Sequence, residues 1–328
     1  MRIGITGEQG FIAKNLAKEI NRLGHTFVSF DKDEFANDNM NYTQDGSVCV
    51  YNNTVDNWVS LIQKLDLDVI VHNAAVVGTD VVALNPDEAV NTNVLGTRKI
   101  TDAANITNIL NVYMGTTVIY DTFLYQETDI TEESVIFPRT DYALQKYAGE
   151  MIVRNSAKNW LVTRPLFAYG GEGDMNSLIA KSLYGVKNNK TDIDMFLSPD
   201  KIKDYMHVED FCKGVMMLVD SDIRNNHFNI TAENPFNTAE IISQIEEVTG
   251  YSLEGVVKWH SETDYLGNHR LSCEKFKNAV GDLNARTLKE GIRQSWQSIK
   301  DSGEEYNPLK YLEEAKEKDF DLKVHYPT

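Results

Sequence analysis

The sequence predicts an α/β protein, a Rossmann-type, doubly wound parallel sheet with a smaller C-terminal α/β lobe. Three observations predict it: short apolar runs alternate with amphipathic helical stretches, a glycine-rich turn lies between the first run and the first helix, and an acidic residue closes the second run. Strands separated by helices of this length require right-handed crossovers, which build a parallel sheet with helices on both faces.

The alternation begins at the N-terminus. Residues 2–6 form a short apolar run, and residues 11–23 carry apolar side chains at helical spacing until Gly24 ends the helix. A second strand is expected at residues 25–30. The same alternation then predicts helices at 55–65, 86–104 and 141–155, and strands at 68–72, 110–114 and 160–164.

The hydrophobic pattern of the sequence changes after Tyr169, where predicted loops rich in Gly, Asn and Asp separate shorter segments with helical or strand periodicity. Helices are expected there at 211–219, 238–248 and 288–299. A length of 328 residues favours two lobes. We expect a nucleotide-binding domain at 1–169 with contributions from about 203–230, a substrate lobe at 170–300, and a charged peripheral helix and tail at 301–328.

Composition narrows the function classes. The net charge of −17 argues against a nucleic-acid surface, because phosphate backbones are bound by clustered Lys and Arg. The three cysteines are far apart, which predicts neither a metal site nor a disulfide framework and fits a reducing compartment. No signal-peptide pattern opens the chain, and no apolar run approaches the roughly 20 residues of a membrane span. We expect a cytoplasmic protein without metal, nucleic-acid or membrane partners.

The glycine-rich turn has the pattern Gly-x-x-Gly-x-x-Ala. Such a turn lets the backbone approach a pyrophosphate, while the N-terminus of the following helix supplies N–H groups and a partial positive charge. The tighter Gly-x-Gly-x-x-Gly pattern is absent, so an ordinary turn is the alternative. The expected dinucleotide contacts in this turn are Gly7, Gln9, Gly10, Phe11 and Ile12.

Asp31 strengthens the dinucleotide interpretation. It lies about 20 residues beyond the turn, where a carboxylate binds the adenosine ribose hydroxyls. A carboxylate there repels a 2′-phosphate and favours NAD over NADP, whereas the neighbouring Lys32 weakens that choice. We expect both residues to contact the cofactor.

A catalytic centre is predicted from Thr116, Tyr142 and Lys146. Tyr142 and Lys146 are four residues apart and share one helix face, although such a pair also occurs by chance on surface helices. A nearby ammonium lowers the pKa of a phenol from about 10, so that it can accept a proton at neutral pH. Thr116 follows a strand, at the sheet edge where ligands bind, and can donate a hydrogen bond to the reacting oxygen.

With these residues, the chain resembles the extended short-chain dehydrogenases/reductases of the nucleotide-sugar epimerase/dehydratase family. The resemblance covers roughly residues 1–296. It rests on the glycine turn, Asp31, the catalytic residues and four ordered motifs: His72-Asn73-Ala74-Ala75, Asn91-Thr92-Asn93-Val94-Leu95-Gly96-Thr97, Arg164-Pro165 with Tyr169-Gly170, and Lys203-Asp204-Tyr205-Met206-His207-Val208-Glu209-Asp210.

The resemblance implies tightly held NAD and a nucleoside-diphosphate sugar substrate. It implies that Ala74 and Ala75 line the cofactor, that Asn93 lies on the nicotinamide side, and that Lys146 holds the nicotinamide ribose. It also implies a homodimer paired through the helices near 94–104 and 142–155.

Departures from the family pattern bear on the reaction. The 4,6-dehydratases follow the catalytic Thr with Asp and Glu, whereas Thr117 and Val118 follow Thr116 here. The GDP-fucose synthase type carries Cys at the Val118 position, so its double epimerisation is unsupported. Thr117 is instead expected to contact substrate.

The expected substrate contacts also include Phe167, Asn176 and Arg270. The family usually has an Asn at the position of Phe167, where it contacts the sugar diphosphate. Either that binding is altered here, or it moves to Asn176 and Arg270, with an ordinary surface arginine as the alternative for Arg270. The leading hypothesis is an NAD-dependent nucleotide-sugar 4-epimerase acting through a 4-keto sugar. A 4-keto reductase or dehydrogenase with the same triad is the runner-up, ahead of a 4,6-dehydratase and of a non-catalytic NAD-binding protein.

Overall fold

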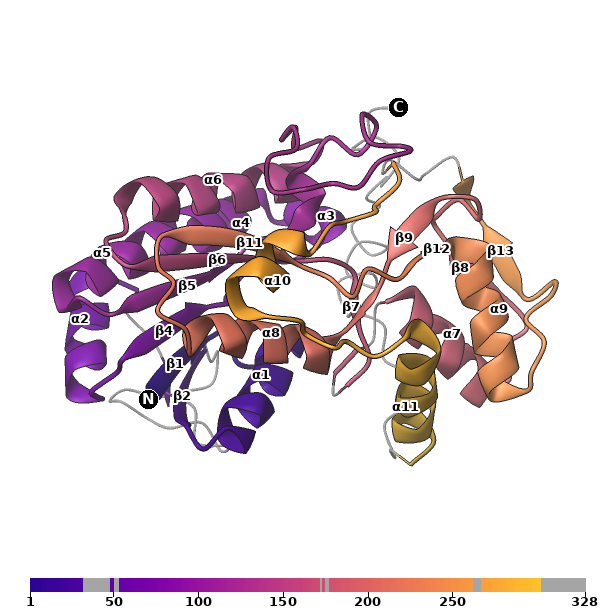
Figure 1. Cartoon of the computed structure of the whole chain (residues 1–328), viewed down its shortest axis with the longest axis horizontal. Coiled ribbons are helices and arrows are strands. Elements are labelled where there is room, and N and C mark those ends of the chain that lie inside the picture. The colour runs from indigo at the N-terminus through magenta and orange to yellow at the C-terminus, as the bar shows by residue number, and fades with distance from the viewer. Residues whose placement is uncertain (32–47, 50–52, 172, 175–176, 262–266, 302–328) are drawn as a thin grey trace. The chain divides into compact units, whose positions relative to one another are not determined.

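The computed structural model describes residues 1–31, 48–49, 53–171, 173–174, 177–261 and 267–301. It divides into two compact units (Figure 1). Unit 1 comprises Met1–Ile119, Pro138–Pro165 and Cys212–Phe228, and unit 2 comprises Tyr120–Phe137, Leu166–Phe211 and Asn229–Thr328. The expected charged tail beyond residue 301 lies outside the described residues.

The predicted parallel sheet is confirmed. Seven strands lie in the order β11-β6-β5-β4-β1-β2-β3, and the recorded pairs from β3 to β6 are all parallel. The strands are β1 (Arg2–Thr6), β2 (Thr26–Asp31), β3 (Val48–Cys49), β4 (Val69–His72), β5 (Leu110–Met114), β6 (Trp160–Pro165) and β11 (Asn226–Ile230). The strand order reverses between β1 and β4, and in such sheets ligands bind beyond the carboxyl ends of the strands at this point.

Helices cover both faces of the sheet (Figure 1). Helices α2 (Val55–Lys64), α5 (Thr97–Thr107) and α6 (Asp141–Ser156) lie on one face, and α1 (Phe11–Arg22) lies on the other with α8 (Val208–Val219). Helix α1 buries apolar side chains at i, i+3, i+4 and i+7, namely Ala13, Leu16, Ala17 and Ile20. None of the described helices is long and apolar enough to cross a bilayer.

The segment 86–104, expected as one helix, is divided. Helix α4 (Pro86–Val90) continues into a π-helical turn, η1 (Asn91–Gly96), before α5 begins. Three further helices were not predicted: α3 (Thr79–Leu84), α7 (Leu178–Lys187) and α10 (Glu274–Val280).

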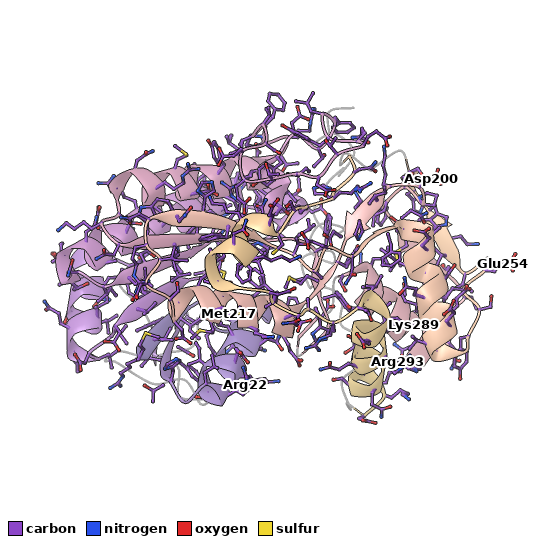
Figure 2. The ribbon with its side chains drawn as sticks, in the orientation of Figure 1. Arg22, Asp200, Met217, Glu254, Lys289 and Arg293 are labelled. Atoms are coloured by element: carbon purple, nitrogen blue, oxygen red, sulfur yellow. The ribbon has the colours of Figure 1, made fainter. Side chains whose placement is uncertain are left out.

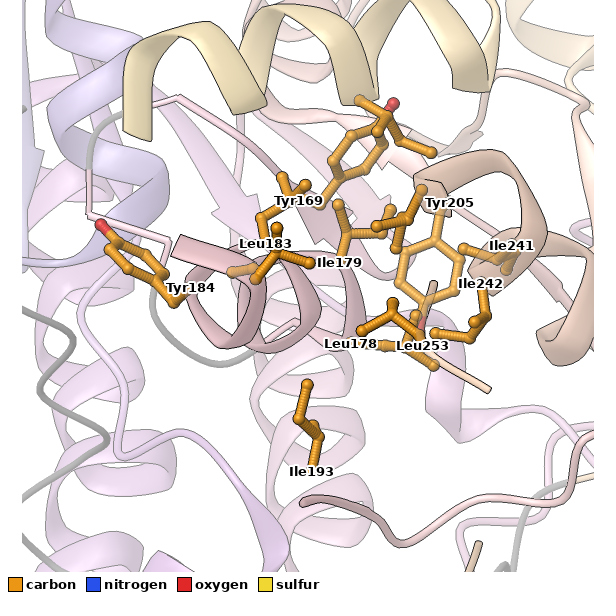
Figure 3. Packing of buried hydrophobic residues seen from close by; sticks show 14 of the residues in the cluster. Tyr169, Leu178, Ile179, Leu183, Tyr184, Ile193, Tyr205, Ile241, Ile242 and Leu253 are labelled. Atoms are coloured by element: carbon orange, nitrogen blue, oxygen red, sulfur yellow. The ribbon is translucent and has the colours of Figure 1, made fainter. Parts of the chain in front are cut away.

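Unit 2 is built from short strand pairs and helices. The pairs are β7 (Ala168–Tyr169) with β10 (Met206–His207), β8 (Ile193–Met195) with β13 (Val257–Trp259), and β9 (Ile202–Asp204) with β12 (Pro235–Asn237). Its other helices are α9 (Thr238–Thr249), α10 (Glu274–Val280) and α11 (Leu288–Asp301). Side chains from α7, α9 and α11 share one apolar core, and Figure 3 shows part of it, including Tyr169, Ile179, Leu183, Tyr205 and Ile241.

Helix ends in unit 2 follow the expected capping chemistry. Asn237 accepts a hydrogen bond from the Glu240 N–H at 2.8 Å, and the Glu240 carboxylate accepts one from the Asn237 N–H at 2.9 Å. Gly250 then ends α9 in the left-handed conformation. Acidic side chains such as Asp200 and Glu254 project into solvent (Figure 2), in keeping with the acidic composition.

Candidate active site in unit 1

The glycine turn lies directly against the chain that follows β4. Gly7 has a φ of +71°, and a Cβ placed on it would lie 2.7 Å from the Ala74 Cα. A second turn bond joins the Gly10 N–H to the Gly7 carbonyl at 3.0 Å, after which α1 begins at Phe11. Only glycine combines this φ with so close a backbone approach. The turn therefore presents bare backbone beside Ala74, as a bound pyrophosphate requires.

Asp31 is tied to the same turn. Its Oδ2 accepts a hydrogen bond from the Gln9 N–H at 2.9 Å. The second strand therefore ends with a carboxylate held beside the turn, which is the arrangement predicted for binding a ribose. Lys32 lies outside the described residues.

A buried histidine joins β1, β4 and α5. The Thr6 Oγ1 accepts from the Ala74 N–H at 3.0 Å and lies 2.9 Å from the His72 Nδ1. The His72 Nε2 lies 2.9 Å from the Thr97 Oγ1, which donates to the Asn93 carbonyl at 2.7 Å. Because Thr97 has used its proton, His72 must donate from Nε2 and accept from Thr6 at Nδ1. Burial, helped by the charge on Lys146, lowers the pKa of His72 to about 3 and keeps it neutral.

Asn93 anchors the loop after β4. Its Oδ1 accepts from the Val76 N–H at 2.8 Å, and its Nδ2 donates to the Val76 carbonyl at 3.0 Å and to the Gln145 Oε1 at 2.9 Å. Gln145 lies between the two predicted catalytic residues of α6. The π-helical turn places Asn93 so that it joins this loop to that helix, and π-turns recur at functional sites.

Helix α6 carries Tyr142 and Lys146. It begins after Thr140, whose hydroxyl accepts from the Ala143 N–H at 3.2 Å. Tyr142 is half-buried, and Lys146 is only 4% exposed. Burial lowers the pKa of Lys146 to about 7, and the nearby Glu150 opposes that shift.

The residues after β5 are largely buried. Thr116 is 7% exposed, and its Oγ1 accepts a long hydrogen bond of 3.4 Å from the Val118 N–H. Thr117 is fully buried and donates to the Pro165 carbonyl at 3.2 Å. This hydrogen bond uses the Thr117 proton inside unit 1, and a substrate contact for Thr117 stays a prediction.

The other predicted substrate residues belong to unit 2. Phe167 has a positive φ of 25°, and its ring centroid lies 5.4 Å from that of Tyr205 and 5.1 Å from that of His269. Arg270 is half-exposed and pairs with Asp129, with 3.2 Å between Nε and Oδ1. Asn176 lies outside the described residues.

This chain is similar in sequence to a known family of proteins. A model of the NAD dependent epimerase/dehydratase family matches residues 3–231. The chain belongs to this family.

Three proteins to which this chain is similar carry different names. GDP-6-deoxy-D-talose 4-dehydrogenase of Aggregatibacter actinomycetemcomitans is 28% identical over 268 residues, which are 77% of this chain and 82% of that protein. Among solved structures, dTDP-glucose 4,6-dehydratase of Bacillus anthracis in complex with NAD is 22% identical with a TM-score of 0.79, covering 94% of this chain and all of that one. UDP-glucuronic acid 4-epimerase of Bacillus cereus, in complex with UDP-glucuronic acid and NAD, is 17% identical with a TM-score of 0.76, covering 92% and 99%.

The sequence motifs include Arg164, but neither Arg164 nor Tyr113 was predicted to lie near Lys146 and Glu150. Tyr113 of β5 lies beneath the Lys146 ammonium, and Arg164 of β6 binds Glu150 of α6. Two signals in the sequence point to these contacts. One is the glycine at position 149 inside the predicted helix, and the other is the charged Arg164 in the predicted strand at 160–164.

Proposed function

We propose that this protein is an NAD-dependent nucleotide-sugar epimerase that inverts C4 of a nucleoside-diphosphate sugar through a transient 4-keto sugar. NAD, when bound, supplies the hydride acceptor for the sugar carbon. The bare backbone at Gly7, Gly10 and Ala74 fits its pyrophosphate, and the Asp31 carboxylate fits its adenosine ribose. The other proposed cofactor contacts are Gln9, Phe11, Ile12, Lys32, Ala75 and Asn93, together with Tyr142 and Lys146.

The proton chemistry rests on helix α6. Tyr142 takes the proton from the C4 hydroxyl and returns it, and Thr116 donates a hydrogen bond to the same oxygen. Lys146 holds the nicotinamide ribose and, while charged, favours the phenolate form of Tyr142. Asn93 supports this arrangement, because it fixes the loop after β4 to Gln145 on the same helix.

One observation carries the choice of hydride chemistry over dehydration. Elimination of water needs an acid and a base beside the catalytic hydroxyl. Here Thr117 is buried with its hydroxyl bound to Pro165, and Val118 has no titratable group. A single proton-transfer group, Tyr142, is sufficient to oxidise and reduce an alcohol.

A second candidate is a nucleotide-sugar 4-dehydrogenase or 4-keto reductase. The relative named GDP-6-deoxy-D-talose 4-dehydrogenase favours it, because that name describes net oxidation at C4. The same triad serves both reactions, and they differ in whether reduced cofactor accumulates.

The experiment incubates the purified chain with UDP-, GDP- and dTDP-hexoses, follows products by NMR, and records absorbance at 340 nm. An epimer at C4 with no net absorbance change is the expected result, and stoichiometric NADH formation would establish the dehydrogenase instead. Tyr142→Phe should lower turnover by about 10²- to 10⁴-fold. Tyr147→Phe, on the same helix, is the matched control and should retain activity. Unchanged turnover in Tyr142→Phe would refute the mechanism.

We further propose a cytoplasmic homodimer. Exposed apolar side chains lie on η1 and α6, where Leu95 is 46% exposed and Leu144 is 56% exposed. Exposed apolar side chains are stabilised when a second copy of the chain buries them. Their position on η1 and α6 therefore supports pairing through these helices. Cys212 and Cys273 are buried thiols that are not joined in a disulfide, which fits a reducing compartment.

A further inference from the structure

Tyr113 contacts Lys146 in two ways. The Lys146 ammonium lies 4.5 Å from the centroid of the Tyr113 ring, within the range of a cation–π interaction. The Tyr113 hydroxyl donates to the Lys146 main-chain carbonyl at 3.0 Å. The ring therefore faces the charge, while the hydroxyl fixes the backbone of the same residue.

Gly149 makes room for this contact. A Cβ placed on Gly149 would collide with the Tyr113 Oη and would lie 3.0 Å from the Asn93 carbonyl oxygen. Glycine is unfavourable inside a helix, so its presence in the middle of α6 needs a structural reason. The close approach of Tyr113 is that reason.

The other groups around Lys146 offset only part of the cost of burying its charge, because Glu150 attracts the ammonium but is shared with other cations. His72 from β4 is neutral, and its ring centroid lies 5.8 Å from that of Tyr113. Glu150, one turn further along α6, is engaged by Arg164 from β6. Tyr142 lies one turn before Lys146 on α6. Burial keeps the pKa of Tyr113 well above 10, so Tyr113 presents a neutral ring to the ammonium. The face of that ring therefore adds to the attraction of Glu150 for the buried ammonium.

We propose that Tyr113 is a positioning residue for Lys146, holding the ammonium in its charged form by its ring and in its place by its hydroxyl. This role builds on the proposed function only in taking Lys146 as the group that binds the cofactor ribose. The contact itself lies wholly within unit 1.

The test replaces Tyr113 in the full-length chain with Phe, 4-fluorophenylalanine and 3,4,5-trifluorophenylalanine. Fluorine withdraws charge from the ring face at nearly constant shape, which separates the cation–π contact from packing. The titration of Lys146 is followed by NMR of ¹³Cε-labelled lysine, with the signal assigned from Lys146→Arg. The Lys146 titration can be separated from that of ordinary lysines, because burial lowers the pKa of Lys146 from 10.5 to about 7.

The midpoint for Lys146 should fall stepwise from Phe to trifluorophenylalanine by about one unit in total, since a weaker ring attraction favours the neutral amine. NAD affinity at pH 7.5, measured by calorimetry, should weaken in the same order. A midpoint that does not move along the series would overturn the proposal.

Tyr169→Phe is the matched control, because Tyr169 is also buried and donates its hydroxyl to a main-chain carbonyl, that of Leu288 at 3.2 Å. Tyr169→Phe should leave the titration midpoint of Lys146 unchanged. A shift of this midpoint in Tyr169→Phe as large as the shift across the Tyr113 series would also overturn the proposal. The series distinguishes the two levels of argument. If the midpoint moves but no sugar is turned over, the proposed function fails and the role of Tyr113 stands; if sugars are epimerised and the midpoint is constant, only the role of Tyr113 fails.

Discussion

Arg164 donates two hydrogen bonds to the carboxylate of Glu150, from Nε to Oε2 at 3.0 Å and from Nη2 to Oε1 at 2.5 Å. The Arg164 side chain is fully buried and that of Glu150 is 1% exposed. Arg154 adds a third contact to the same carboxylate at 3.1 Å. The pair joins β6 to α6 one turn beyond Lys146, so the catalytic helix is fixed to the sheet through a desolvated ion pair.

Glu150→Gln should therefore destabilise the protein by about 3–5 kcal/mol, because it leaves the Arg164 charge buried without its partner. Denaturant unfolding measures the change. Asp102→Asn removes one partner of the exposed Arg98–Asp102 pair on α5 and should have no measurable effect. Equal midpoints for Glu150→Gln and the parent chain would show that the buried pair contributes little.

Lys146→Met should abolish activity and yet stabilise the chain near neutral pH. Burial lowers the pKa of Lys146 from 10.5 to about 7, so between these values the unfolded state binds more protons than the folded state. The cost of burying the charge is present in full below pH 7 and is relieved as the pH rises toward 10.5. The stability gain of Lys146→Met should shrink by roughly 3 kcal/mol between pH 7 and pH 10. Thermal unfolding without added nucleotide measures it, and a pH-independent difference would contradict the shift.

His72 predicts an acid limit to stability. Its pKa is lowered from 6.5 to about 3, so the stability present above pH 6.5 is lost as the pH falls toward 3. His72→Gln keeps an amide donor and acceptor between Thr6 and Thr97 without a titratable ring. We expect this variant to lose less stability than the parent between pH 6.5 and pH 4. Parallel pH curves in circular dichroism melts would argue against a neutral, buried His72.

Asp31 should set the preference for cofactor. Asp31→Asn keeps an oxygen that can accept from the Gln9 N–H but removes the charge that repels a 2′-phosphate. The ratio of NAD to NADP affinity should fall about tenfold, the factor that corresponds to ~1.4 kcal/mol. Calorimetry with each nucleotide measures it. An unaltered ratio would mean that the preference arises elsewhere.

The regular part of the fold could be predicted because its signals are local. Strands of five or six residues and amphipathic helices such as α1 show their period in the sequence, and their alternation predicts a parallel sheet through the crossover rule. Helix α7 was missed because nearly all its residues are buried, which removes the polar face that marks a helix. The two- and three-residue strands of unit 2 are too short to show alternation.

Thr116, Tyr142 and Lys146 could be proposed as catalytic residues from their spacing and order, but the residues that surround them could not be predicted. Within the π-turn at Asn91–Gly96, Asn93 binds Val76 and Gln145, and these contacts join residues distant in sequence. In the sequence, nothing distinguishes Tyr113 from other strand residues, because its contacts with Lys146 form only when α6 packs against β5. Local patterns therefore suggest candidate reacting groups, whereas the side chains that contact these groups are set by tertiary packing.

Arg270 is predicted to bind the substrate diphosphate, and Asp129, which pairs with it in this structure, would then compete with the phosphate. Asp129 accepts from the Arg270 Nε at 3.2 Å, and both side chains are exposed enough to exchange partners. If Arg270 binds the substrate diphosphate, Asp129→Asn should tighten binding of UDP, GDP or dTDP by about two- to fivefold, the scale of an exposed ion pair. Arg270→Gln should weaken it by tenfold or more, because a charge-assisted hydrogen bond contributes roughly 1.5–3 kcal/mol. Glu254→Gln, an equal change of charge at an exposed position in unit 2 (Figure 2), is the control and should leave the Kd unchanged. Equal Kd values for Arg270→Gln and the parent would assign Arg270 to the surface alone.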